Sequence, residues 1–280
     1  MDQPVPIPTL HLFPVLNELL VDLLRSLSPE DWNRPTIAKL WTVKDIAAHL
    51  LDTNMRAIAS RDSYVPPGPA QNIDNYSQLV AYLNELNATW VQAMKRISPQ
   101  QLIELLESTG KECSIYFSTL DPFATSKYSV AWAGEEQSLN WFDIARVYTE
   151  KWHHHQQIRD AVGKTDALMI RQLFYPCIDT FICGLPHAYR DVESDMGSVI
   201  QITISSESGG NWYLVKKTNG WVLDKYAHTN TPDALIIIEP DIAWKLFTKA
   251  ITADLAIARS VTKGNIKLAR NVFSLIAVMA

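Results

Sequence analysis

The chain has 280 residues, of which 47% are hydrophobic, and this is enough apolar material for one large core or two smaller ones. A formal net charge of −5 argues against a surface that contacts nucleic-acid phosphates. No apolar run is long enough to span a membrane, and the first residues do not resemble a signal peptide. We therefore expect a soluble cytoplasmic protein with no nucleic-acid or membrane partner.

Two amphipathic helices are predicted at the beginning of the chain. Leucines at helical spacing predict the first helix over residues 12–27. The second helix should follow Thr42, whose side chain can cap the amide of Asp45 while Asp45 reaches back in a capping box. We assign Trp41 to an apolar contact at this helix start, without a role in chemistry. The helix should continue to about residue 61, which places His49 two turns from its start.

Two further helices are predicted in the next part of the chain. Apolar residues occupy one side of the segment 75–97. The sequence Ser98-Pro-Gln-Gln101 then has the pattern of a helix cap, and the helix that it begins should continue to about residue 107. The segment 113–132 is poorly periodic and contains several serines and threonines, so we expect irregular structure there.

The segment 138–161 is predicted to form a central helix with an unusual apolar stripe. Glu150 and His154 lie four residues apart on this stripe, and such polar groups are costly to bury unless they are paired or bound. Together with His49 they could hold a divalent metal with an open coordination position, which is the arrangement of catalytic zinc. Two alternatives stay open from the spacing alone. His49 could be a hydrogen-bonded core or surface histidine, and His153–His155 could be a solvated helix face.

The pattern changes in the last third of the chain. A helix is expected from residue 165 to about residue 183, and helices are also expected over residues 240–247 and 271–279. Alternating or β-branched runs predict four strands, over residues 199–204, 211–215, 220–223 and 234–238. We therefore expect a two-domain α+β protein, with a helical domain over residues 1–190 and a small α+β domain over residues 191–280.

Three motifs stand out in the first domain, namely Asp31-Trp-x-Arg-Pro-Thr36, Trp41-Thr-Val-Lys-Asp-Ile-Ala-Ala-His-Leu50 and Glu150-x-x-x-His154-x-x-Gln-Ile-Arg159. They resemble the N-terminal domain of mycothiol-dependent maleylpyruvate isomerases, part of the DinB/YfiT-like superfamily of metal-binding four-helix bundles. The segments Asp233-Ala-Leu-Ile-x-Ile-x-Pro-Asp-x-Ala-Trp244 and Ile276-Ala-Val-Met-Ala280 resemble the C-terminal domain of these isomerases, which is related to sterol carrier proteins. The resemblance thus covers nearly the whole chain.

The resemblance implies that His49, Glu150 and His154 are metal ligands. The implied cofactors are a divalent metal, zinc first with nickel or another divalent ion as alternatives, and a low-molecular-weight thiol such as mycothiol or bacillithiol. The implied activity is that of a thiol-dependent isomerase or transferase acting on a small electrophilic acid. One residue departs from the pattern, because the isomerases commonly have an aspartate where this chain has Gln157.

A second hypothesis is a non-catalytic protein, in which the metal braces the bundle and the C-terminal domain binds an apolar ligand. A fourth protein ligand, such as His153 or a cysteine, would favour this alternative.

The resemblance also implies that a basic residue of the C-terminal domain helps to hold an acidic substrate. Lys249 is the nearest candidate, and we expect the metal site to open toward that domain. The alternative is an ordinary exposed lysine at a helix C-terminus, where a positive charge is favourable.

Overall fold

The computed structural model describes residues 3–65, 67–69, 72–226 and 231–278. The chain divides into two compact units, each built from segments that are distant in the sequence. We call residues 9–124 and 150–165 the bundle unit, and residues 3–8, 125–149 and 166–278 the sheet unit. The domain limits predicted from the sequence, with a boundary at residue 190, stay a prediction. None of the helices in the described ranges has the length and apolarity to cross a membrane.

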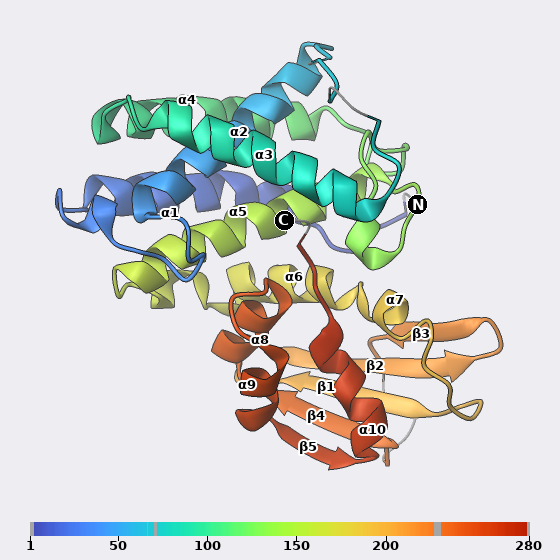
Figure 1. Cartoon of the computed structure of the whole chain (residues 1–280). Helices are drawn as coiled ribbons and strands as arrows, with labels where there is room; N and C mark the ends of the chain where they lie inside the picture. Colours follow the sequence, from blue (N-terminus) through green and yellow to red (C-terminus); the bar gives the residue numbers. More distant parts are fainter. Residues whose placement is uncertain (1–2, 66, 70–71, 227–230, 279–280) are drawn as a thin grey trace. The chain divides into compact units, whose positions relative to one another are not determined.

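The bundle unit consists of long helices packed side by side (Figure 1). Helix α2 packs against α3 and α4, and α4 also packs against α1. The core of this unit is formed by buried leucine, isoleucine, valine, alanine and tryptophan side chains from α1, α2, α4 and α5 and from the short turn at Trp32. The helices are α1 (Phe13–Arg25), α2 (Val43–Arg61), α3 (Tyr76–Met94), α4 (Pro99–Ser118) and α5 (Asn140–Ala161), with α5 shared between the two units.

The start of α2 confirms the predicted capping box. The Thr42 hydroxyl accepts a hydrogen bond from the Asp45 amide at 3.3 Å, and the Asp45 carboxylate accepts one from the Thr42 amide at 3.0 Å. Val43, Ile46 and Ala47 are completely buried just after the cap. The cap therefore fixes the direction in which α2 enters the core, and with it the position of His49 two turns later.

The irregular structure predicted from residue 113 is wrong for the first part of that segment, because α4 continues to Ser118. The apolar face of α4 continues through Cys113 and Phe117, both of which are buried. The hydroxyl of Ser114 is satisfied within the helix, since it donates to the Gly110 carbonyl at 2.9 Å. Serine and threonine that bond to carbonyls of the preceding turn do not interrupt a helix whose buried face persists.

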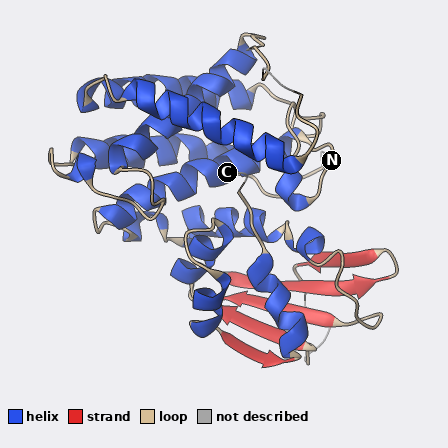
Figure 2. Ribbon diagram, viewed as in Figure 1, coloured by secondary structure: helices blue, strands red, loops and turns tan. Residues whose placement is uncertain are grey.

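The sheet unit contains one five-stranded sheet in the order β3-β2-β1-β4-β5 (Figure 2). Strands β1 and β4 are parallel neighbours, and the other adjacent pairs are antiparallel. Helices α8, α9 and α10 lie over one face of the sheet (Figure 1). The strands are β1 (Val199–Ile204), β2 (Gly210–Lys217), β3 (Gly220–Asp224), β4 (Ala234–Ile238) and β5 (Val261–Gly264). The helices are α6 (Arg171–Ile182), α7 (Leu185–Ala188), α8 (Pro240–Phe247), α9 (Ala253–Ala258) and α10 (Ile266–Ala269).

The four predicted strands and the helix over residues 240–247 are confirmed, but the end of the chain differs from the prediction. The segment 271–279 is not an α-helix: a short 3-10 turn ends at Ser274, and no helix follows in the described residues up to 278. Ala277 is fully buried, and its amide donates to the Phe247 carbonyl at the end of α8. The apolar residues of this segment are therefore buried in an extended conformation, which a hydrogen bond to the C-terminal end of α8 stabilises. Residue 279 lies outside the described ranges.

Candidate metal centre

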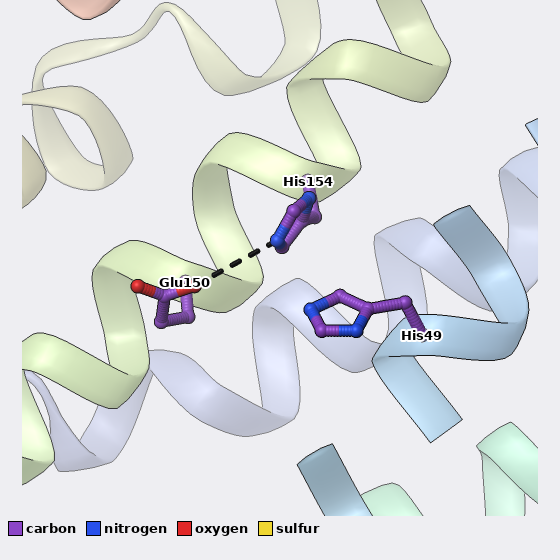
Figure 3. A group of neighbouring side chains, drawn as sticks. All are labelled: His49, Glu150 and His154. Carbon is purple, nitrogen blue, oxygen red and sulfur yellow. Dashed lines mark ion pairs between the residues drawn. The ribbon is translucent and has the colours of Figure 1, made fainter. Parts of the chain in front are cut away.

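Two helices of the bundle unit bring the three predicted ligands together. His49 projects from α2, and Glu150 and His154 project from successive turns of α5 toward it (Figure 3). One ligand atom from each residue lies within 4.8 Å of the other two. The His154 Nε2 and a Glu150 carboxylate oxygen are 3.7 Å apart, and the rings of His49 and His154 are 4.6 Å apart between centroids.

Both imidazoles of this group are held neutral by their surroundings. Burial lowers the pKa of His49 well below its ordinary value, and the nearby His154 lowers it further. Burial likewise lowers the pKa of His154, with a further contribution from His153. A neutral imidazole has a lone pair available for a metal, so no proton has to leave either ring before an ion binds near neutral pH.

Gln157 fixes the orientation of the His154 ring. Its side-chain carbonyl lies 2.9 Å from His154 Nδ1 and accepts a hydrogen bond from that nitrogen. The proton of the neutral ring is therefore on Nδ1, which leaves the lone pair of Nε2 directed toward Glu150. Gln157 is thus a residue whose role the sequence did not reveal, although its difference from the aspartate of the isomerases was visible.

No such hydrogen bond orients the His49 ring within the described residues. Its Nδ1 is buried and has no hydrogen-bond partner in the part of the chain that the structure describes. The two imidazoles therefore differ, since His154 is oriented by a hydrogen bond and His49 by packing alone.

The aromatic ring of Trp41 lies beside two of the three residues, His49 and His154. Its ring lies 4.9 Å from the His49 ring and 6.1 Å from the His154 ring, measured between centroids. The assignment of Trp41 to the helix start alone was therefore incomplete. A bulky aromatic residue just before the cap of the helix that carries His49 was the available signal, because side chains at this position fold back over the first turns.

The neighbouring histidines are not a solvated helix face, and that alternative is wrong. His153, His154 and His155 are exposed by only 3%, 8% and 1%. His155 Nε2 accepts a hydrogen bond from Arg159 Nε at 2.9 Å, on a side of α5 away from Glu150. Within the described residues, the metal-compatible group contains neither His153 nor a cysteine.

Lys249 is the residue that follows the C-cap of α8 and has left-handed backbone geometry, with φ of 60°. Its contact with an acidic substrate stays a prediction.

The donor set fits a divalent ion of the zinc type. Zinc takes imidazole nitrogen and carboxylate oxygen at about 2.0–2.2 Å, so tetrahedral ligands of this kind lie roughly 3.4 Å apart. The separation of 3.7 Å between His154 and Glu150 is close to this value, and the limit of 4.8 Å for the whole group requires only a small closure. Two nitrogens and one oxygen also leave a coordination position open.

Comparison with known proteins agrees with this architecture. A family model described as the mycothiol maleylpyruvate isomerase N-terminal domain matches residues 15–159, a range that includes all three residues of the group. No curated protein sequence matches the chain.

Solved structures show the same fold at low sequence identity. A histidine-to-alanine variant of the mycothiol-dependent maleylpyruvate isomerase is 9% identical, with 94% of each chain covered and a TM-score of 0.54. A second structure of the mycothiol-dependent maleylpyruvate isomerase is 10% identical, with 88% of this chain and 89% of that chain covered and a TM-score of 0.52. A UbiJ-SCP2 ubiquinone synthesis protein covers 34% of this chain with a TM-score of 0.25, which is too low to support an argument. The likeness to the isomerase structures confirms the predicted α+β fold.

Proposed function

The chain belongs to the family of the mycothiol maleylpyruvate isomerase N-terminal domain, and on this premise we propose that it is a metal-dependent enzyme that uses a low-molecular-weight thiol. The proposed reaction is the isomerisation of a small electrophilic acid or the transfer of the thiol to it. The observation that supports this most strongly is the group of two neutral, buried imidazoles and one carboxylate within 4.8 Å. Such a set is costly to bury unless it binds a cation.

The ligands in this proposal are His49, Glu150 and His154, and the ion is zinc first, with nickel or another divalent ion as alternatives. An ion bound by these residues with an open position would lower the pKa of a thiol and keep it as the nucleophilic thiolate near neutral pH. Gln157 holds the His154 ring so that its Nε2 is directed toward Glu150 and would be available to such an ion. The Trp41 ring lies beside both imidazoles, tilted by 42° to the His49 ring and by 37° to the His154 ring, and contributes apolar surface to the site.

The thiol and the substrate class are inferred from the related structures. Mycothiol is the first candidate because it is in the names of the related structures, and bacillithiol is the second. The substrate class is a small unsaturated acid, for which maleylpyruvate is the natural first test.

The experiment is an activity assay with maleylpyruvate and each thiol, on purified protein as isolated, after treatment with a chelator, and after reloading with zinc. We expect isomerisation that requires the thiol, stops after chelation and returns with zinc. Conversion that is unaffected by chelation would contradict the role of the metal.

The second candidate function is a metal-braced protein that binds an apolar ligand, and the burial of both imidazoles is the observation that favours it. X-ray absorption on the zinc-loaded protein separates the two, because a fourth protein ligand indicates a structural site and bound water an open one. A large fall in melting temperature after metal removal, without thiol-dependent activity, would also favour the second candidate.

A further inference from the structure

Arg56 places a guanidinium on the side of α2 that carries His49. The two residues are seven positions apart, which is close to two full turns, so they lie on nearly the same face of the helix. The charge of Arg56 acts on the His49 ring, because it lowers the pKa of that imidazole in addition to burial and the nearby His154. Arg56 therefore lies close to the candidate metal centre and in the same unit of the chain.

The side chain of Arg56 extends back along α2 toward His49. Its Nη2 lies 2.5 Å from a carboxylate oxygen of Asp52, which is four residues nearer to the start of the helix. Side chains on a helix lean toward its N-terminus, and this contact shows that the guanidinium follows that direction. The guanidinium is thus about one helical turn, roughly 5.4 Å along the axis, from the level of His49.

Two buried polar side chains hold this guanidinium in place. Asp52 pairs with it from α2, and the side-chain carbonyl of Asn87 on α3 accepts a hydrogen bond from Nη2 at 3.1 Å. Burial raises the pKa of Asp52, and the nearby Arg56 opposes this rise. Burying a carboxylate and an amide is costly, and such a pair contributes little net stability. It does fix the position of an arginine side chain that is itself 42% exposed, as binding a ligand from solution requires.

Most of the hydrogen-bond donors of Arg56 are not used by the protein. Both side-chain contacts involve Nη2, and within the described residues neither Nε nor Nη1 has a hydrogen-bond or ion-pair partner. These two nitrogens carry three N–H groups. An arginine stays protonated in proteins, and its N–H groups form charge-assisted hydrogen bonds with carboxylates.

We propose that Arg56, positioned by Asp52 and Asn87, binds a carboxylate of the acidic substrate beside the metal centre. The inference rests on the proposed function, since it assigns a binding partner to the substrate of that site. In a small unsaturated acid only a few bonds separate the carboxylate from the reacting carbon, which suits a guanidinium about one turn from His49. Arg56 belongs to the bundle unit, so this contact is independent of the one predicted for Lys249.

The test measures the binding of maleate, an unsaturated dicarboxylate, to the full chain by isothermal titration calorimetry, with zinc and after treatment with a chelator. Arg56→Gln should weaken maleate binding by about 10–100-fold under both conditions, because it removes charged hydrogen-bond donors. Arg56→Lys should have an intermediate affinity, since lysine keeps the charge but lacks the planar set of donors. The matched control is Arg61→Gln, which should keep the affinity. Its arginine is on the same helix, is 39% exposed and also pairs with carboxylates.

A double variant separates binding from folding. Arg56→Gln leaves the buried Asp52 carboxylate without its partner, which destabilises the protein. The Asp52→Asn, Arg56→Gln double variant removes both charges, and circular dichroism shows whether its helices remain. We expect it to lose maleate affinity to the same extent as Arg56→Gln.

Unchanged maleate affinity in the double variant, or no binding of maleate to the unsubstituted protein, would overturn the inference. A lower melting temperature with unchanged affinity would overturn it too, because Arg56 would then only connect α2 to α3. Binding that depends on Arg56, without thiol-dependent isomerisation, would support the inference and contradict the proposed function. Isomerisation with an unchanged KM in Arg56→Lys and Arg56→Gln would contradict the inference and leave the proposed function intact.

Discussion

Replacing Gln157 by leucine should weaken zinc binding about tenfold. The substitution keeps a side chain of similar size but removes the acceptor that lies 2.9 Å from His154 Nδ1. An imidazole ring that binds zinc through Nε2 becomes a stronger hydrogen-bond donor at Nδ1. The hydrogen bond to Gln157 therefore stabilises the metal-bound protein more than the metal-free protein, and its loss lowers the zinc affinity. Loss of a residue that orients a metal ligand typically lowers metal affinity by about 10–100-fold. We expect a loss at the lower end of this range because the acceptor is a neutral amide, whose hydrogen bonds are weaker than those of a carboxylate.

The Gln157→Glu variant should shift the affinity in the opposite direction. A carboxylate accepts a stronger hydrogen bond and makes the His154 ring a more basic ligand, so we expect zinc to bind more tightly. The assay is competition between metal-free protein and a chromophoric chelator at fixed pH. The matched control is Gln156→Leu, which makes the same replacement at the preceding position, where the side chain instead donates to the Thr165 carbonyl.

Unchanged zinc affinity in Gln157→Leu would contradict this role of Gln157. An equal loss of affinity in Gln156→Leu would contradict it too, because the effect would then come from the packing of α5 and not from the orientation of His154.

Two further predictions concern stability. Asp179→Ala should lower the free energy of unfolding by about 2–3 kcal/mol. The buried Asp179 carboxylate accepts a hydrogen bond from the Trp212 indole at 2.8 Å and pairs with Lys225, whose side chain is 47% exposed. Denaturant unfolding measures the change, and an unchanged unfolding midpoint would contradict the prediction. The metal-free protein should lose stability as pH falls below about 6.5, because burial lowers the pKa of His49 and His154, so the unfolded chain binds more protons than the folded one. Melting temperatures in the presence of a chelator should show a shallower pH dependence when both histidines are replaced by glutamine, and an identical dependence would contradict the assignment.

The features that the sequence predicted well are those decided by residues close together in the chain. The capping box needs only Thr42 and Asp45, and the pairing of Glu150 with His154 needs only the four-residue spacing of a helix. The strands of the sheet unit were visible because alternation and β-branching are local properties.

The features that it did not predict depend on contacts between distant segments. The approach of His49 to α5 results from the packing of helices, and spacing alone left it open. Strand β5 is mostly exposed and has no alternation to identify it, so its existence depends on pairing with β4. The 3-10 turn and extended end after Arg270 depend in the same way on the carbonyl of Phe247.

The role of Gln157 lies between these two cases. Its position three residues after His154 is local, but an amide at this spacing is common on helices and indicates no function by itself. The hydrogen bond between Gln157 and His154 indicates a role in metal binding only because Nε2 of the same ring is directed toward Glu150 and His49.

The measurement that tests the central claim most directly is the metal content of purified protein, determined by elemental analysis. The unsubstituted chain should contain about one divalent ion per molecule, and the His49→Ala, His154→Ala double variant should lose most of it while circular dichroism shows that its helices remain. The His11→Ala variant, which removes an exposed histidine from the same unit, should keep the ion. Equal metal content in the double variant and the unsubstituted protein would contradict the proposed metal site.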